Sequence, residues 1–327
     1  MKTLFLGNFG ARPGVWEAIL AKTTEKLDVS VLFDLDDSQR LMPALAEAEI
    51  VVSHIWKKGF PEAPRVKLLQ SVAAGIDLID VPSLPRGVTV CNVAGHEQAI
   101  AEYVVLTALA WHHRLIDIAA AFRGGVWSTG GGAGGGPTHG EILGKTIGIV
   151  GYGKIGREVA KRAVGFGCRV IGANRSPIAD RGDASEIYPL AELDRMLPLC
   201  DVVVIAAGLG PETTRLIDAS RLGAMKPTAF LINIGRAGIV DEEALYAALK
   251  DNKIGGAALD VWWQYPTPAE PHRHGSRLPF HELPNVILTP HCSSATDGAR
   301  ERRFSAVAGN LDRFVRGETL INVVMTT

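Results

Sequence analysis

The feature that most constrains the fold of this chain is a glycine-rich turn between a strand and a helix. The apolar run Ile147–Val150 is typical of a buried parallel strand. Gly151, Gly153 and Gly156 follow with G-x-G-x-x-G spacing, and an amphipathic helical pattern continues from them. The three glycines permit, in order, a tight turn, close approach of a pyrophosphate and close packing of the helix on the strand. The pattern predicts a dinucleotide site at the helix N-terminus, in preference to a turn without a ligand.

Composition limits the classes of protein that fit. The chain has 327 residues, enough for two domains, and 47% of them are hydrophobic. A net charge of −1 gives no indication of a nucleic acid partner or of an anionic membrane surface. The four cysteines are Cys91, Cys168, Cys200 and Cys292, and their spacing fits neither a zinc site nor a disulfide framework. We therefore expect that the protein binds no metal, that its thiols are reduced and that it is cytoplasmic.

Two apolar segments need separate interpretation. The N-terminal apolar run is too short for a secretory signal and predicts a first strand. Charged residues and histidines interrupt the long apolar segment 99–122, which therefore predicts one packed helix and no membrane span. Because so much of this helix is apolar, it requires a partner surface from another domain or another subunit.

Residues 1–98 alternate between short apolar runs and helical patterns. The expected strands are Leu4–Leu6, Val29–Phe33, Ile50–Ser53, Leu68–Val72 and Val88–Cys91, with helices at 15–27 and 40–48. Such alternation favours a parallel sheet covered by helices. Ala74 and Gly75 lie in a loop after the fourth strand, where open α/β sheets bind ligands, and small residues there would expose amides to an anion. Taken alone, this loop is better interpreted as a plain tight turn.

The same alternation continues after the glycine-rich turn. The expected strands are Arg169–Ala173, Asp201–Ala206, Thr228–Ile234, Gly255–Leu259 and Val286–Leu288. A helix is expected over 241–250, with acids in its first turn and a lysine at its end. Before the turn, residues 123–140 contain GGGAGGG at 130–136, which predicts a mobile or functional loop.

The end of the second of these strands selects the dinucleotide. NAD sites usually have a carboxylate there, about 20 residues past the glycine motif, on the ribose 2′-hydroxyl. Here Asn174 takes that place, and Arg175 and Ser176 follow. A neutral amide beside a guanidinium suits a 2′-phosphate, so we expect NADP in preference to NAD, with NAD still possible. The alternative is a surface arginine without a partner.

Several longer motifs carry a resemblance to a known family. They are VAAGIDLID at 72–80, the spaced glycine and Ala-Glu after Asn92, GKTIGIVGYGKIG at 144–156, MKPTAFLINIGRAGIVDEEAL at 225–245, ALDV at 258–261 and LPNVILTPH at 283–291. Over nearly the whole chain the sequence resembles the D-isomer-specific 2-hydroxyacid dehydrogenase family. The resemblance implies two doubly wound parallel-sheet domains, with an active site in the cleft between them and a homodimer formed through the segment 99–122. The two implied domains are a flavodoxin-like substrate domain, residues 1–98 plus 292–327, and a Rossmann dinucleotide domain, residues 99–291.

The resemblance also assigns roles to residues. Arg236 takes the position of the family's catalytic arginine and His291 that of its acid/base histidine. A cation is needed to hold and polarise a 2-oxo acid, and a histidine titrates in the range suited to protonating its carbonyl oxygen. The expected dinucleotide contacts are Gly151, Gly153, Lys154, Ile155, Gly156, Asn174, Arg175, Ser176, Ala207, Ile234 and Asp260, and Ala74 and Gly75 are the expected substrate contacts.

One position departs from the family pattern. The glutamate that pairs with the histidine is expected five residues after Asp260, but Tyr265 occupies that place. A neutral phenol can orient an imidazole but cannot retain a proton on it by charge. Either Tyr265 completes the catalytic group, or Glu270 or Glu282 supplies the carboxylate. The neighbouring Trp262 and Trp263 are interpreted as core aromatics, although one of them could line a pocket for a bulkier substrate.

Two classes of function fit these residues. The first is an oxidoreductase that interconverts a small 2-oxo acid and a D-2-hydroxy acid by hydride transfer, and the presence of Arg236 and His291 favours it. The alternative is a dinucleotide-sensing regulatory protein with weak or no turnover, favoured by the missing glutamate. A third possibility is a different hydride donor, because the same fold also hosts formate and phosphite oxidation.

Overall fold

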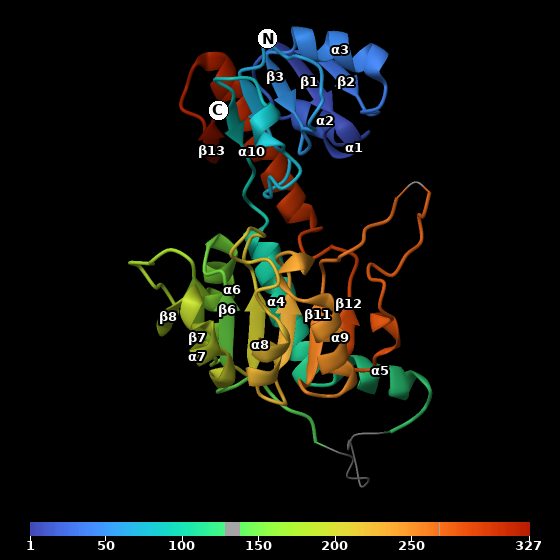
Figure 1. The fold of residues 1–327 in the computed structure, drawn as a ribbon, viewed down its shortest axis with the longest axis vertical. Helices are drawn as coiled ribbons and strands as arrows, with labels where there is room; N and C mark the ends of the chain where they lie inside the picture. Colours follow the sequence, from blue (N-terminus) through green and yellow to red (C-terminus); the bar gives the residue numbers. More distant parts are fainter. Residues whose placement is uncertain (128–137, 268) are drawn as a thin grey trace. The chain divides into compact units, whose positions relative to one another are not determined.

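The computed structural model describes residues 1–127, 138–267 and 269–327, so the expected loop at 130–136 lies outside the described residues. Contacts divide the chain into a terminal unit, Met1–His96 with Thr296–Thr327, and a central unit, Glu97–Ala295. These boundaries lie within a few residues of the expected 98 and 292. Each unit is built on a largely parallel sheet covered by helices, as the sequence predicts (Figure 1).

The terminal unit has one sheet in the described part of the chain, with the strand order β13-β5-β4-β3-β1-β2. Its strands are β1 (Lys2–Leu6), β2 (Asp28–Leu32), β3 (Ile50–Val52), β4 (Leu68–Gln70), β5 (Thr89–Cys91) and β13 (Val323–Thr326). All pair in parallel except β13, which is antiparallel to β5. Its helices are α1 (Gly7–Gly10), α2 (Trp16–Leu20), α3 (Ser38–Glu47) and α10 (Asp297–Arg316), with a 3-10 turn at Val81–Ser83.

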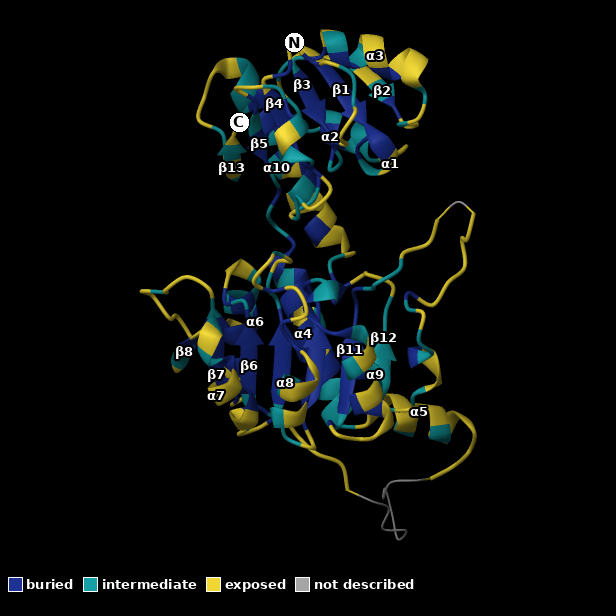
Figure 2. Cartoon of the chain, viewed as in Figure 1, coloured by how far each residue is buried: buried dark blue, intermediate teal, exposed yellow. Residues whose placement is uncertain are grey.

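Both faces of β1, β3 and β4 are covered, which explains why these strands are mostly apolar, whereas the edge strands β2 and β13 are partly exposed. On one face, Leu41 and Leu45 of α3 pack against Leu4, Leu6 and neighbouring strand residues. On the other, α2 and α10 cover Phe5 and Val52 through Ile19, Phe304 and Leu311. Figure 2 shows β1 and β3 as buried and much of α3 as exposed.

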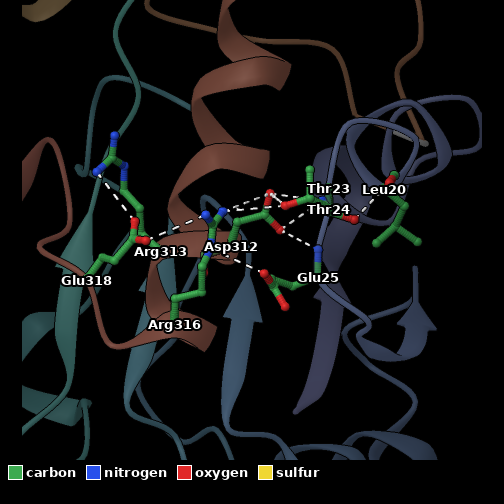
Figure 3. A network of polar contacts seen from close by, with 8 residues as sticks. All are labelled: Leu20, Thr23, Thr24, Glu25, Asp312, Arg313, Arg316 and Glu318. Atoms are coloured by element: carbon green, nitrogen blue, oxygen red, sulfur yellow. Dashed lines mark hydrogen bonds and ion pairs between the residues drawn. The ribbon is translucent and has the colours of Figure 1, made fainter.

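Helix α2 is much shorter than the helix expected over 15–27, and Figure 3 shows why. The backbone amides of Thr24 and Glu25 donate to the carboxylate of Asp312 on α10, at 2.9 and 3.0 Å. Burial opposes ionisation of Asp312, but these bonds and the nearby Arg316 outweigh it and hold its pKa below the usual value. A partner nearly 300 positions away in the sequence therefore ends the helix.

The central unit has, among the described residues, a wholly parallel sheet with the order β12-β11-β10-β9-β6-β7-β8. Its strands are β6 (Thr146–Val150), β7 (Arg169–Asn174), β8 (Glu186–Pro189), β9 (Val202–Ile205), β10 (Phe230–Asn233), β11 (Gly256–Leu259) and β12 (Val286–Leu288). Its helices are α4 (Glu97–His112), α5 (Leu115–Arg123), α6 (Lys154–Gly165), α7 (Leu193–Met196), α8 (Ala219–Ala224) and α9 (Glu242–Lys250). Short 3-10 segments lie at Leu190–Glu192, Leu197–Leu199, Ala237–Ile239 and Phe280–Glu282. The edge strand β8 was not among the expected strands.

Alternate residues of these strands enter two separate cores. Val202 and Val204 of β9 face the layer of α4 and α6, while Val203 and Ile205 face the layer of α7, α8 and α9. A sheet buried on both faces leaves its strand ends as the place for polar groups and ligands. The carboxyl ends of these strands therefore position the candidate site.

The segment 99–122 is not the single helix that its apolar character predicts. Arg114 adopts a left-handed conformation with φ of 53°, which no right-handed helix can continue, and α4 and α5 meet at 61°. α4 packs against α6 and β10, whereas α5 buries none of its residues. No single helix in the described ranges is long and apolar enough to cross a membrane, although this bent pair meets the same criterion when taken together.

Candidate active site

The turn after β6 has the geometry that the glycine motif predicts. Gly151 has a φ of 94°, and a Cβ there would lie 2.5 Å from the amide nitrogen of Ala207. A Cβ on Gly156 would lie 2.8 Å from the carbonyl oxygen of Gly151. A Cβ on Gly153 would meet nothing within 4 Å. The first and third glycines are thus fixed by the protein itself, whereas the second borders open space.

This open space is a cavity of about 750 Å³ at the N-terminus of α6. α6 has no side-chain cap and no acidic residue in its first turn, so its amides and dipole are available to an anion. The cavity is lined by Gly151, Gly153, Asn174, Arg175, Ser176, Leu190, Ala206, Ala207, Gly208, Leu209, Gly210, Pro211, Glu212 and Thr213. These features fit a dinucleotide with its pyrophosphate on α6.

The predicted dinucleotide contacts divide into two groups. Six of them line the cavity, namely Gly151, Gly153, Asn174, Arg175, Ser176 and Ala207. Lys154, Ile155, Gly156, Ile234 and Asp260 do not line it. The loop from Gly208 to Thr213, which the sequence analysis missed, forms a large part of the wall. Its signals in the sequence are Gly208 and Gly210, shortly after β9, and the family motif PETTRLI at 211–217, to which no cofactor role was assigned.

The ribose end of the cavity has charged residues on two sides. Arg175 Nε lies 3.8 Å from a carboxylate oxygen of Glu212, and both side chains are mostly exposed. The side-chain amide of Asn174 donates to the carbonyl oxygen of Ser176 at 2.8 Å, which fixes the turn that carries Arg175. An exposed pair of this kind contributes about 0.2–1 kcal/mol, so it would yield readily to a phosphate.

At the opposite end of the same sheet edge, His291 follows β12. Its Nδ1 lies 2.7 Å from the hydroxyl of Tyr265, and the backbone amide of Trp262 approaches the same hydroxyl at 3.4 Å. His291 has a φ of 56°, in the left-handed region that side-chain-bearing residues rarely adopt. Backbone strain of this sort is concentrated at functional sites. Tyr265 is therefore the hydrogen-bond partner of His291, as the spacing from Asp260 predicts.

A buried carboxylate holds the loop that carries His291. Asp260, which is fully buried, accepts hydrogen bonds from the Thr289 hydroxyl at 2.6 Å and from the amides of Cys292 and Ser293 at 2.8 and 3.0 Å. Since the Thr289 hydrogen points to Asp260, the phenol of Tyr103 donates to Thr289 at 2.7 Å. Burial raises the pKa of Tyr103 to about 12, which keeps it a donor. The sequence analysis missed both Thr289 and Tyr103.

Two charged neighbours of His291, Arg236 and Asp260, shift its pKa in opposite directions. Loss of hydration is the main influence and lowers the pKa of His291, and the positive charge of Arg236 adds to this effect. The negative charge of Asp260 opposes both but does not outweigh them. Loss of hydration likewise raises the pKa of Tyr265, so the phenol is neutral near neutral pH.

The alternative carboxylates have other partners. Glu270 pairs with Arg273 at 3.2 Å, and Glu282 lies 3.9 Å from His281. Neither contributes to the pKa shift of His291. Trp262 donates its indole N–H to the carbonyl of Thr289 at 2.8 Å, so it supports the histidine loop in addition to packing against the core. Trp263 stacks on Phe280 as a core aromatic.

Arg236 lies just beyond the carboxyl end of β10, on the same edge of the sheet as His291. It follows Gly235, where a Cβ would lie 2.6 Å from the carbonyl oxygen of Ala207, so no larger residue fits beneath the arginine. The half-buried side chain donates to the carbonyl of Gly235 at 2.9 Å. Its charge acts on both His291 and Tyr265. A guanidinium so placed can hold a carboxylate beside a proton-donating imidazole.

Ala74 and Gly75 lie in the terminal unit, directly after β4. The carbonyl of Ala74 accepts a hydrogen bond from the side-chain amide of Asn92 at 2.8 Å, and the Ser71 hydroxyl caps Ala73 through its amide and carbonyl. Asn92 belongs to one of the motifs that carried the family resemblance. The loop therefore has a defined backbone conformation at the carboxyl edge of its sheet, as a ligand-binding loop requires.

Comparison with known proteins agrees with this geometry. Residues 105–293 match the model of the D-isomer specific 2-hydroxyacid dehydrogenase, NAD binding domain. The chain is 39% identical to a glyoxylate reductase of Thermococcus onnurineus over 80% of this chain and 78% of that protein. It is 37% identical to the glyoxylate reductase of Pyrococcus furiosus over 94% of this chain and 88% of that protein.

Solved structures give the same result. An acyclic imino acid reductase in complex with NADPH and D-Arg superposes with a TM-score of 0.81 at 26% identity, covering 99% of this chain and 100% of that one. A 2-hydroxyacid dehydrogenase from Ketogulonicigenium vulgare superposes with a TM-score of 0.81 at 27% identity, covering 99% and 98%. With its glycine turn, its Arg236–His291 edge and these relatives, the chain belongs to the D-isomer specific 2-hydroxyacid dehydrogenase family.

Proposed function

We propose that the protein reduces a small 2-oxo acid to a D-2-hydroxy acid and uses NADPH in preference to NADH. One observation carries the proposal: the His291 imidazole is held at Nδ1 by Tyr265, on the same strand edge as Arg236 and the dinucleotide cavity. The family membership and the similarity to glyoxylate reductases support a 2-oxo acid as the substrate.

In the proposed reaction the residues of this chain bind the substrate and move one proton. When bound, the nicotinamide supplies the hydride to the carbonyl carbon. Arg236 holds the substrate carboxylate and polarises the carbonyl. The phenol oxygen of Tyr265 accepts a hydrogen bond from the Nδ1–H of protonated His291 and so directs Nε2 to the carbonyl oxygen, which receives the Nε2 proton as the carbon is reduced. In the reverse direction, neutral His291 removes the hydroxyl proton.

The preference for NADPH is supported by the ribose end of the cavity. Asn174 replaces the carboxylate that would repel a 2′-phosphate, and Arg175 offers a guanidinium at the cavity wall. The structurally similar acyclic imino acid reductase was solved with NADPH. Glu212 is the opposing feature, since its carboxylate lies beside Arg175.

Steady-state kinetics with glyoxylate and pyruvate test the reaction. His291→Asn is the variant of choice, because asparagine tolerates the left-handed backbone of this position better than alanine. We expect it to lower kcat about 10²–10⁴-fold while dinucleotide affinity and thermal stability stay close to those of the wild type. Arg236→Met should instead raise KM strongly. Near-normal turnover of the His291 variant, or a wild type that binds NADPH but reduces no 2-oxo acid, would contradict the proposal, and the second result would favour a dinucleotide-sensing protein.

We also propose a homodimer formed through α5 and residues 124–127. Leu115, Ile116, Phe122 and Trp127 all have more than half of their surface exposed, and Phe122 and Trp127 contact each other edge to face. An apolar patch of this kind marks an interaction surface. Analytical ultracentrifugation should give a dimer for the wild type and a monomer for Ile116→Asp. A monomeric wild type would refute the assignment.

A further inference from the structure

Tyr265 lies in a part of the central unit without regular secondary structure. Among the described residues between β11 and the 3-10 segment at Phe280–Glu282 there is neither a helix nor a strand. With 45% of its surface exposed, Tyr265 also receives limited support from packing. Its hydroxyl nevertheless lies 2.7 Å from Nδ1 of His291, on a different loop. Because neither a main-chain ladder nor a core holds the phenol there, hydrogen bonds of nearby side chains must do so.

Arg273 forms such bonds with the chain around Tyr265. Its Nη2 donates to the side-chain carbonyl oxygen of Gln264 at 2.7 Å, and its Nη1 approaches the main-chain carbonyl oxygen of Tyr265 at 3.5 Å. The carboxylate of Glu270 lies 3.2 Å from the same guanidinium. A guanidinium presents several donors in one plane, so one side chain can hold several acceptors at once. Arg273 thus ties the chain at Tyr265 to the returning part of the loop.

The returning part of the loop is itself fixed in place. The backbone amide of Gln264 donates to the carbonyl oxygen of Gly275 at 2.9 Å. Gly275 has a φ of 77°, and a Cβ there would lie 2.4 Å from the indole of Trp262. Trp262 in turn donates to the carbonyl of Thr289, two residues before His291. The backbone next to Arg273 therefore packs on the same indole that supports the histidine loop.

Arg277, four residues further on, provides a contrast. It pairs with Glu242 at 3.4 Å and with Glu243, both on α9, and its side chain is 59% exposed. The side chain of Arg273 is only 27% exposed. Neither arginine is among the charges that shift the pKa of His291. An exposed ion pair with a helix accounts for Arg277, whereas the partners of Arg273 lie next to the phenol.

We infer that Arg273 is a positioning residue, which fixes the main chain at Tyr265 so that the phenol stays hydrogen-bonded to His291. This role rests on the proposed reductase function and adds to it the residue that keeps the imidazole oriented. Arg273 takes no part in the proton transfer itself. Its loss should free the phenol to leave His291, with the same consequence as removal of the phenol hydroxyl.

Steady-state kinetics with glyoxylate compare Arg273→Met with the wild type. Methionine keeps an unbranched side chain but has no donors. We expect kcat to fall about 3- to 10-fold, as for the loss of one orienting hydrogen bond, while KM stays within about twofold. Arg273→Lys should recover part of the loss, because an ammonium group can still bond to Gln264 or Glu270.

Arg277→Met is the matched control, since Arg277 belongs to the same segment but bonds to α9. It should keep the kcat of the wild type. An unchanged kcat in Arg273→Met, or an equal fall in both variants, would overturn the positioning role. A rise in KM at constant kcat would also overturn it, because that result indicates contact with the substrate.

A double-mutant cycle separates positioning of the phenol from a general structural role. Tyr265→Phe removes the hydroxyl but keeps the main-chain carbonyl that Arg273 approaches. Adding Arg273→Met to Tyr265→Phe should therefore lower kcat by less than about twofold. If the two losses multiply in the double variant, Arg273 acts on another part of the site and the positioning role is wrong.

Nuclear magnetic resonance needs no turnover and so distinguishes this role from the proposed function. The ¹⁵N resonance of His291 Nδ1, assigned by its absence in His291→Asn, should shift in Tyr265→Phe because the nitrogen loses its hydrogen bond. Arg273→Met should reproduce most of that shift, and Arg277→Met none of it. If this holds while no 2-oxo acid is reduced, the proposed function fails and the positioning role stands. A resonance that Arg273→Met leaves in its wild-type position would overturn the positioning role.

Discussion

Two regions at the carboxyl edge of the central unit's sheet are built in different ways. At β6 the turn is shaped by main chain against main chain: Gly151 and Gly156 have no room for a Cβ, while Gly153 borders the cavity. After β12 the loop is shaped by side chains, with the carboxylate of Asp260 receiving three hydrogen bonds and Tyr265 holding His291.

The difference bears on how each region can vary. Backbone packing admits one residue type at a given position, so the dinucleotide turn is rigid and its sequence signature is short and local. A side-chain network tolerates exchange of one partner for another of different charge, as with Tyr265 in place of the family's glutamate. Such exchange preserves geometry but alters the protonation equilibrium of the histidine.

The largest expected effect follows from breaking the backbone-built turn. Gly151→Ala places a Cβ 2.5 Å from the Ala207 amide at a φ of 94°. The backbone conformation alone costs about 1–3 kcal/mol, and the overlap adds to it. We expect a lower urea midpoint and no measurable NADPH binding. Gly153→Ala, where the Cβ meets nothing, should keep the wild-type midpoint and weaken only dinucleotide binding; equal destabilisation of both variants would contradict this contrast.

A smaller effect is expected from the side-chain network. Thr289→Val removes the bond to Asp260 and leaves the partly buried hydroxyl of Tyr103 without its acceptor. The expected loss is about 1–3 kcal/mol of unfolding free energy, with a fall in kcat because the His291 loop loosens. Tyr103→Phe removes only one bond and should cost about 1 kcal/mol, measured by the same urea titration. If Thr289→Val matches the wild type in stability and kcat, the network does not hold the loop.

The smallest effects on stability are expected at the ribose end of the cavity, where Arg175 and Glu212 are both mostly exposed. Arg175→Ala should weaken NADPH binding by about 1.5–3 kcal/mol and leave NADH nearly unchanged, as measured by fluorescence titration. Glu212→Gln removes the carboxylate 3.8 Å from Arg175 and should tighten NADPH binding by about 0.2–1 kcal/mol. If either variant changed the affinities for NADPH and NADH equally, Arg175 and Glu212 would not be the residues that recognise the 2′-phosphate.

The local parts of this structure were predictable from the sequence, and the non-local parts were not. Strand positions and the glycine turn follow from periodicity and spacing, and the family motif located Tyr265 against His291. The helix expected over 15–27 was wrong because Asp312 takes the amides of Thr24 and Glu25. The Asp260–Thr289–Tyr103 hydrogen-bond chain joins residues from distant segments without any shared motif. Only the folded structure brings them together.

In the proposed mechanism a phenol, in place of a carboxylate, holds the imidazole that donates the proton. Its most direct test is the pH dependence of kcat/KM for reduction in the wild type, Tyr265→Glu and Tyr265→Phe. In the proposed reaction His291 must be protonated for reduction, and its pKa is lowered, so activity should fall as pH rises through a value below the usual 6.5. Tyr265→Glu should move this fall to higher pH, and Tyr265→Phe should keep its position at a lower rate. Superposable wild-type and Tyr265→Glu profiles would contradict the account.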